Sequence, residues 1–128
     1  GIGLALARAV AARGGDVVLN GLGDPSEIER MRSEMEAACG VRVRYHAADM
    51  RRGEEVADMV AFARHELGRL DILVNNAGVQ HVEAIEKFPA DKWEQIIAIN
   101  LSSAFYATRA AVPIMKAQGR GRIINVAS

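Results

Sequence analysis

Short runs rich in branched apolar residues recur along this chain, and each is separated from the next by a segment of helical character. The extended runs are residues 17–20, 41–45, 71–74 and 122–126. Apolar runs of this length that alternate with helices are typical of a parallel sheet whose crossover helices cover both faces. We therefore predict an α/β fold, built as a doubly wound parallel sheet.

Helical segments fill the intervals between these runs, and glycine follows most of them. We expect helices over residues 4–13, 25–38, 54–67 and 91–118. Asp24 is expected to cap the second helix, with Glu27 closing a capping box. The last helix contains Pro113, so we expect a bend at that position.

Both ends of the chain fall inside this pattern. A helix that opens with Gly1-Ile2-Gly3 is expected to follow a strand that feeds the glycine turn. Without that strand, the strands at 17–20 and 71–74 are each expected to keep an unpaired edge. We therefore expect residues 1–128 to form one partial domain, lacking its first strand and everything after the fifth.

Composition argues against several classes of function. Sixteen basic and sixteen acidic residues give a formal net charge of zero, so we expect no binding to nucleic acid or to membranes. No apolar run approaches the roughly 18 residues of a membrane span. The single Cys39 fits a reducing, cytoplasmic location and is expected to be half-buried rather than a nucleophile. His46, His65 and His81 lack ligand spacing, so we expect no metal site.

The tetrapeptide Asn-Asn-Ala-Gly at residues 75–78 leaves the strand at 71–74 directly. Ligands of open parallel sheets bind beyond the carboxyl ends of the strands. Small residues there let a cofactor lie against the backbone, and the Asn amides can tie neighbouring strands together and reach a nucleotide. An ordinary Asn-Asn turn explains the polarity of this run, but not its position after a buried strand.

Two glycine-containing turns are further candidates for nucleotide contact. Gly1-Ile2-Gly3 opens a helix, where free N–H groups and a partial positive charge suit a pyrophosphate, although a tight turn alone explains the glycines equally well. Gly21, Leu22 and Gly23 follow the strand at 17–20 and would let an adenosine ribose approach the backbone. This turn contains no Arg or Lys that could bind a 2′-phosphate, which favours NAD over NADP.

Three single residues remain open to two interpretations each. Asp49, followed by Met50, either accepts a hydrogen bond from an adenine amino group, with Met50 against the ring, or caps the next helix. Asn100 is either a surface residue or, as its apolar neighbours favour, a buried one that distorts the helix and holds a water for proton relay. Ser128 either hydrogen-bonds a substrate carbonyl or is a strand-end turn residue.

These motifs occur together and in one order, and the combination resembles the classical short-chain dehydrogenase/reductase family over all 128 residues. The resemblance implies a Rossmann-like fold, a nicotinamide dinucleotide cofactor, Ser128 as the catalytic serine and Asn100 as the proton-relay asparagine. The residues that it implies touch the dinucleotide are Ile2, Gly3, Asp49, Met50, Asn76, Ala77, Gly78 and Ile99.

Three stretches, residues 18–24, 78–82 and 88–105, are similar to bacterial members that interconvert 3-hydroxybutyrate and acetoacetate with NAD. This closer resemblance implies that Gln80 binds the carboxylate of a small hydroxy or keto acid, with His81 beside the substrate cleft. It also implies that Gly21 and Leu22 line the adenosine pocket.

The family's catalytic Tyr-x-x-x-Lys is expected beyond Ser128, so residues 1–128 alone are expected to be inactive. The helix at 91–118 is the family's usual subunit contact, and the resemblance implies a homotetramer. Two other functions stay open. One is another short-chain reductase, such as a 3-oxoacyl-thioester reductase or a sugar dehydrogenase using NADPH. The other is a dinucleotide-binding protein without catalytic activity.

Overall fold

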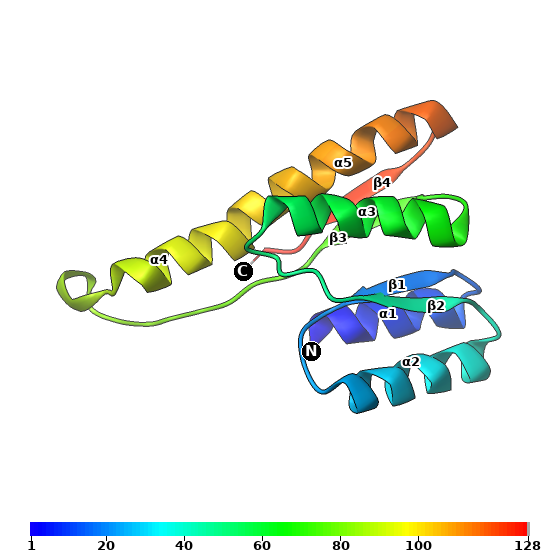
Figure 1. The fold of residues 1–128 in the computed structure, drawn as a ribbon, viewed down its shortest axis with the longest axis horizontal. Coiled ribbons are helices and arrows are strands. Elements are labelled where there is room, and N and C mark those ends of the chain that lie inside the picture. Colours follow the sequence, from blue (N-terminus) through cyan, green and yellow to red (C-terminus); the bar gives the residue numbers. More distant parts are fainter. Residues whose placement is uncertain (128) are drawn as a thin grey trace.

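The computed structural model describes residues 1–127 and arranges them as alternating helices and strands (Figure 1). This order confirms the predicted α/β class. In chain order the elements are α1 (Ile2–Ala12), β1 (Val17–Asn20), α2 (Pro25–Cys39), β2 (Val43–His46), α3 (Gly53–Leu67), β3 (Ile72–Asn75), η1 (Ile85–Lys87), α4 (Ala90–Ile97), η2 (Ala98–Ser102), α5 (Ser103–Gln118) and β4 (Arg122–Asn125).

The four strands form two separate parallel pairs. β1 pairs with β2, with Val17 opposite Val43, and β3 pairs with β4, with Ile72 opposite Arg122. Within residues 1–127, β1 and β3 are not paired with each other, so each keeps an unpaired edge. The sequence predicted these open edges, because the strand that would lie between β1 and β3 is not part of the pattern.

The helices cover the two strand pairs from different sides (Figure 1). α1 and α2 pack against each other and against β1 and β2. α3 and α5 form the most extensive contact between elements; α5 covers β3, and α3 also reaches β2. Helix α3 therefore links the two pairs, as expected of a crossover connection.

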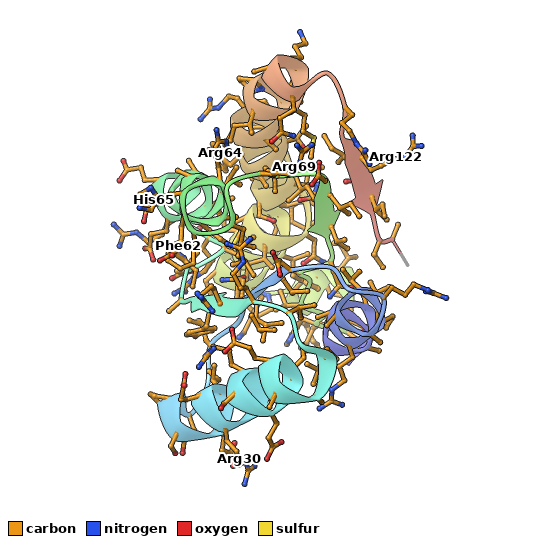
Figure 2. All side chains as sticks on the ribbon, turned by 90° about the vertical axis from the view of Figure 1, so that its right-hand side faces the viewer. Arg30, Phe62, Arg64, His65, Arg69 and Arg122 are labelled. Carbon is orange, nitrogen blue, oxygen red and sulfur yellow. The ribbon has the colours of Figure 1, made fainter. Side chains whose placement is uncertain are left out.

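Two hydrophobic cores result, one for each pair of strands. The smaller core lies between α1, α2, β1 and β2, and its buried members are Ala11, Met35 and Val43. The larger core lies between α3, α5 and β3, and its buried members are Val56, Val60, Leu73, Ala107, Ala111 and Met115. Charged side chains such as Arg30 and Arg122 point away from the molecule (Figure 2).

Helix α2 begins and ends as the sequence predicted, with one difference. The Asp24 carboxylate accepts a 2.8 Å hydrogen bond from the Ser26 N–H, and Gly40 ends the helix with a φ of 66°. The expected capping box is incomplete, because the cap bond is made by Asp24 alone and Glu27 does not return one within the described residues. Asp24 therefore caps the helix by itself, through the hydrogen bond from the Ser26 N–H.

The long helix expected over residues 91–118 is divided into α4 and α5 by an irregular turn. α4 and α5 are joined by η2, one turn of π-helix centred on Asn100. Its wider turn includes a 2.6 Å hydrogen bond from the Ser103 hydroxyl to the Ile99 carbonyl. α5 continues as a helix through Pro113 to Gln118, and the bend expected at this proline stays a prediction. The sequence did predict a distortion at Asn100.

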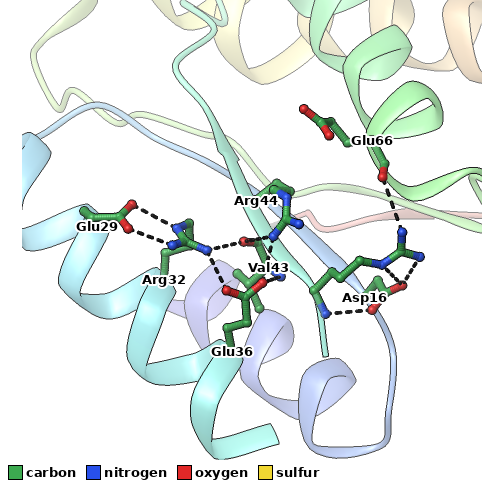
Figure 3. Close-up of polar contacts among 8 residues, drawn as sticks. Asp16, Glu29, Arg32, Glu36, Val43, Arg44 and Glu66 are labelled. Atoms are coloured by element: carbon green, nitrogen blue, oxygen red, sulfur yellow. Dashed lines mark hydrogen bonds and ion pairs between the residues drawn. The ribbon is translucent and has the colours of Figure 1, made fainter. Parts of the chain in front are cut away.

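The outer edge of β2 is closed by side chains of α2 (Figure 3). The Val43 N–H donates to Glu36 Oε1 at 3.0 Å, and Arg32 Nη1 donates to the Val43 carbonyl at 2.8 Å. Arg32 and Arg44 both pair with the same carboxylate. The Val43 bond and these two guanidinium groups hold the pKa of Glu36 at about 2. No helix in the described part of the chain is long and apolar enough to cross a membrane.

Candidate functional site

The carboxyl ends of the parallel strands bring most of the predicted site residues to one end of the molecule (Figure 1). The first turn of α1 lies at the same end. Each strand finishes in a polar residue: Asn20 in β1, His46 in β2, Asn75 in β3 and Asn125 in β4. A ligand that binds at this edge meets amide groups together with exposed apolar side chains such as Ile2 and Leu22.

Asn75 ties β3 to β4, as the sequence predicted for this tetrapeptide. Its Nδ2 donates to Asn125 Oδ1 at 2.9 Å, and its carbonyl accepts from the Val126 N–H at 3.0 Å. Nδ2 also lies 3.4 Å from the hydroxyl of Thr108 on α5. No local pattern pointed to Thr108, because a threonine within a helix rarely binds a strand.

Gly3 and Asn76 come together at the start of α1. A Cβ atom built on Gly3 would lie 2.6 Å from Asn76 Nδ2, so any other residue would displace the Asn76 amide from this position. α1 starts at Gly1 without a side-chain cap, which leaves the N–H groups of its first turn available to a ligand. Ile2 is exposed beside them.

Asn100 holds the loop that follows β3. Its Oδ1 accepts from the Val79 N–H at 2.8 Å and its Nδ2 donates to the Val79 carbonyl at 2.9 Å. A Cβ on Gly78 would lie 3.6 Å from the same Oδ1. The expected burial of Asn100 was wrong: the residue is exposed, because its side chain reaches out of η2 to the loop rather than into a core. Ile99 is half-buried beside it.

Gln80 lies between two tethered neighbours in this loop. Val79 is held by Asn100, and the His81 ring packs edge-on against Phe88 at 5.3 Å between centroids. His81 Nε2 also lies 3.2 Å from a carboxylate oxygen of Glu83. Gln80 is exposed, as is Ala77 at the start of the loop.

Asp49 and Met50 follow β2, and the structure resolves one of the two interpretations of Asp49. α3 begins after Arg52, so Asp49 does not cap that helix. Its carboxylate accepts hydrogen bonds from the guanidinium and the N–H of Arg51, which hold its pKa at about 2. Met50 packs against the larger core, so its side chain points into the protein.

Gly21 and Leu22 follow β1 and form an exposed turn; 72% of Leu22 is accessible to solvent. The Tyr45 hydroxyl on β2 donates to the Gly21 carbonyl. Neither Tyr45 nor Asn20 was predicted from the sequence to be a site residue. A polar residue that ends a buried strand just before a glycine turn was the available signal for Asn20.

Three predictions remain, and they concern a metal site, the Cys39 thiol and Ser128. Residues 1–127 contain no group of three His, Cys, Asp or Glu side chains placed to hold a metal ion. Cys39 is free and half-buried, as expected. Ser128, the predicted catalytic serine, lies outside the described residues.

Two parallel strand pairs, helices on both sides and a polar edge at the strand ends define the Rossmann-like α/β class. The family model described as short chain dehydrogenase matches residues 1–128. The chain therefore belongs to the short-chain dehydrogenase family, whose members bind a nicotinamide dinucleotide.

Three relatives illustrate the similarity. The chain is 53% identical over 129 aligned residues to D-beta-hydroxybutyrate dehydrogenase of Cupriavidus necator, and 52% identical over 128 residues to the enzyme of that name from Rhizobium meliloti. All of the chain is covered, against 49% and 50% of those proteins, so it spans about half their length. It superposes with a TM-score of 0.93, at 36% identity, on NADPH-dependent 3-quinuclidinone reductase of Rhodotorula rubra, covering all of this chain and 48% of that one.

Proposed function

We propose that the protein carrying this chain is an NAD-dependent dehydrogenase that interconverts 3-hydroxybutyrate and acetoacetate. The observation that supports it most is the loop after β3, where Asn100 binds both backbone groups of Val79 and leaves Gln80 exposed at the strand ends. An exposed amide on a tethered loop is suited to a small carboxylate. The two relatives above 50% identity carry the name of this activity.

Nucleotide binding follows from the groups at the strand ends, and residues 1–128 are proposed as part of one nucleotide-binding domain. The first turn of α1 would hold the pyrophosphate, because its N–H groups lack a side-chain cap and Gly3 leaves room beside Asn76. The bound nicotinamide would supply or accept the hydride. The residues proposed to contact the dinucleotide are Ile2, Gly3, Gly21, Leu22, Asp49, Met50, Asn76, Ala77, Gly78 and Ile99.

Preference for NAD over NADP is proposed from the turn after β1. That turn contains no Arg or Lys to pair with a 2′-phosphate. Asp24 follows it, and hydrogen bonds from the Ser26 hydroxyl and N–H lower the pKa of the Asp24 carboxyl, which stays charged at neutral pH. A carboxylate near the ribose repels a further phosphate.

Catalysis is proposed to need groups outside this chain. Ser128 would hydrogen-bond the substrate carbonyl, and Asn100 would support the proton relay. Proton transfer at that carbonyl still needs an acid–base group of suitable pKa, which the family resemblance assigns to a tyrosine after Ser128. Residues 1–128 alone are therefore expected to show no turnover.

The test compares acetoacetate with an uncharged methyl ketone in the full-length protein. Wild type should reduce acetoacetate far better, and Gln80→Ala should raise the KM for acetoacetate about 10- to 100-fold, as expected for a lost hydrogen bond to a charged group. His65→Ala is the matched control, since His65 points outward from α3 (Figure 2). Equal rates on both ketones would refute the proposed substrate.

A reductase that prefers NADPH is the second candidate, because the solved relative at 36% identity is named for NADPH dependence. Such an enzyme would act on a 3-oxoacyl thioester or a sugar. A strong NADPH preference in the same assay would favour it. Nucleotide binding without turnover on any carbonyl substrate would favour the third alternative, a dinucleotide-binding protein that is not an enzyme.

We also propose a homotetramer in the cytoplasm. Large apolar side chains on one stretch of helix are strongly exposed: Trp93 at 58%, Leu101 at 64% and Phe105 at 58%. Exposed apolar groups that gather on one element mark interaction surfaces. The free Cys39 is consistent with a reducing compartment. The native mass of the full-length protein tests the tetramer.

A further inference from the structure

The exits of β1 and β2 are joined by hydrogen bonds that run in both directions. From β1, Asn20 Nδ2 donates to the carbonyl of His46 at 3.0 Å and to that of Ala48 at 3.1 Å. From β2, the Tyr45 hydroxyl donates to the Gly21 carbonyl. Each strand therefore supplies a side chain that binds the backbone just after the other strand.

These bonds lie beyond the regular pairing of the sheet. Asn20 is opposite His46 at the last paired position, so Gly21 and Ala48 have already left the two strands. Without these side-chain bonds, no hydrogen bond within residues 1–127 would connect the glycine turn after β1 to the irregular segment after β2. Asn20 and Tyr45 instead set the distance between the Gly21 turn and the segment that leads to Asp49.

We propose that Asn20 and Tyr45 are positioning residues that hold the two adenosine-binding segments at a fixed separation. This inference rests on the proposed function, in which Gly21 and Leu22 line the ribose side and Asp49 lies at the adenine. Neither donor needs to touch the nucleotide. Their bonds reduce the freedom that these segments would otherwise lose on binding.

The bonds fix one half of the cofactor site only. In the proposed function the nicotinamide lies near the loop after β3, where Asn75 and Asn100 make separate contacts. Loss of the Asn20 or Tyr45 bonds should therefore weaken binding of the adenosine part and leave hydride transfer from the bound cofactor unchanged. A purely structural role predicts a different result, which is lower stability with unchanged affinity for AMP.

The experiment uses the full-length protein with Tyr45→Phe and, separately, Asn20→Ala. We measure kcat, the KM for NAD and the dissociation constant of AMP, which probes the adenosine half alone. Tyr45→Phe, which loses one hydrogen bond, should raise the KM for NAD and the AMP constant roughly threefold to tenfold, and Asn20→Ala, which loses two, should raise them at least as much. In both variants kcat should stay within about twofold of wild type. Tyr45→Phe keeps the ring, so it tests the hydroxyl alone.

Tyr106→Phe is the matched control, because its hydroxyl forms no hydrogen bond within the described residues and its ring packs on the larger core rather than between β1 and β2. Unchanged AMP affinity in Tyr45→Phe and Asn20→Ala, or an equal loss in Tyr106→Phe, would overturn the inference. A fall in kcat at unchanged KM would also overturn it. If wild type binds neither AMP nor NAD, the proposed function fails, and this inference fails with it.

Discussion

The two strand pairs of this protein are stabilised in different ways. The β1–β2 half, residues 1–48, has a small core of Ala11, Met35 and Val43, and its outer strand is bound by charged side chains of α2. The β3–β4 half, residues 50–127, has a larger core of six buried residues against three, and no comparable ion-pair network among its described residues. Similar strand pairs can therefore be stabilised by a small core together with charged side chains at the strand edge, or by a larger core alone.

The helices explain this difference. α2 is rich in Glu and Arg, and two of its side chains, Arg32 and Glu36, bind the backbone of β2 at Val43. α3 and α5 instead meet through small residues, with Ala63, Ala107 and Ala111 all buried. Small side chains let two helices approach closely and bury the larger residues around them.

Truncation of a buried methionine should have the largest effect, and it should differ between the halves. Met115→Ala in the larger core should lower the free energy of unfolding by about 3–4 kcal/mol, because a buried Met→Ala change costs roughly 2–5 kcal/mol and this side chain also fills the space beside Gly121. Met35→Ala, the matched change in the smaller core, should cost about 2 kcal/mol. Urea unfolding of the full-length protein, followed by hydrogen exchange in each half, measures both.

The contrast between the halves predicts where the loss appears. Met115→Ala should speed exchange in α5 and β3, and Met35→Ala in α2 and β2. Equal losses, or a larger loss for Met35→Ala, would show that the two cores do not differ as proposed.

A methyl group at Gly53 should have an intermediate effect on the β3–β4 half. A Cβ there would lie 2.9 Å from ring carbons of Tyr106, so α3 and α5 would have to separate. Gly53→Ala should cost about 1–2 kcal/mol, since overpacking exceeds the small helix preference of alanine. The second change Tyr106→Leu should restore part of the loss, as a thermal unfolding cycle would show. Strictly additive losses would contradict the steric explanation.

Loss of the Glu36 carboxylate should have the smallest effect on stability of these substitutions, and it should change how the stability of the β1–β2 half depends on pH. Glu36 has its pKa lowered from 4.5 to about 2 by the Val43 N–H, Arg32 and Arg44. A lowered pKa in the folded state means that its contribution is complete above about pH 4.5 and is lost as the pH falls toward 2. Glu36→Gln should remove this acid dependence and speed exchange of the Val43 amide at neutral pH.

Hydrogen exchange of β2 between pH 5 and 2.5, corrected for intrinsic rates, provides the measurement. Glu29→Gln is a matched control, because Glu29 pairs with Arg32 but does not bind β2. An unchanged Val43 amide in Glu36→Gln would mean that the ion pairs do not protect this edge.

Local patterns in the sequence predicted the strands and the open edges of β1 and β3. Position at a strand end was enough to predict that the amides of residues 75–78 tie strands together, and Asn75 does so. A polar residue among apolar neighbours predicted the distortion at Asn100, but not its exposure, which depends on where the following loop runs.

Contacts that depend on register were beyond prediction. Tyr45 reaches Gly21 only because β1 and β2 pair with Asn20 opposite His46, and no local pattern fixes that alignment. No sequence pattern predicts that Arg32 and Glu36 bind Val43, because this contact depends on how α2 packs beside β2. Arg51 is a competing partner for Asp49 that only the folded turn shows.

The separation between β1 and β3 has a consequence for the order of folding. Each strand pair has its own core, so each can collapse through contacts that are short along the chain. A single sheet requires a fifth parallel strand to pair with β1 and β3 at once, which is a late and entropically costly step. Until then, one edge each of β1, β3 and β4 remains unpaired within residues 1–127, whereas Arg32 and Glu36 already bind the outer side of β2 at Val43. Misassembly should therefore begin at these unpaired edges rather than at the outer side of β2.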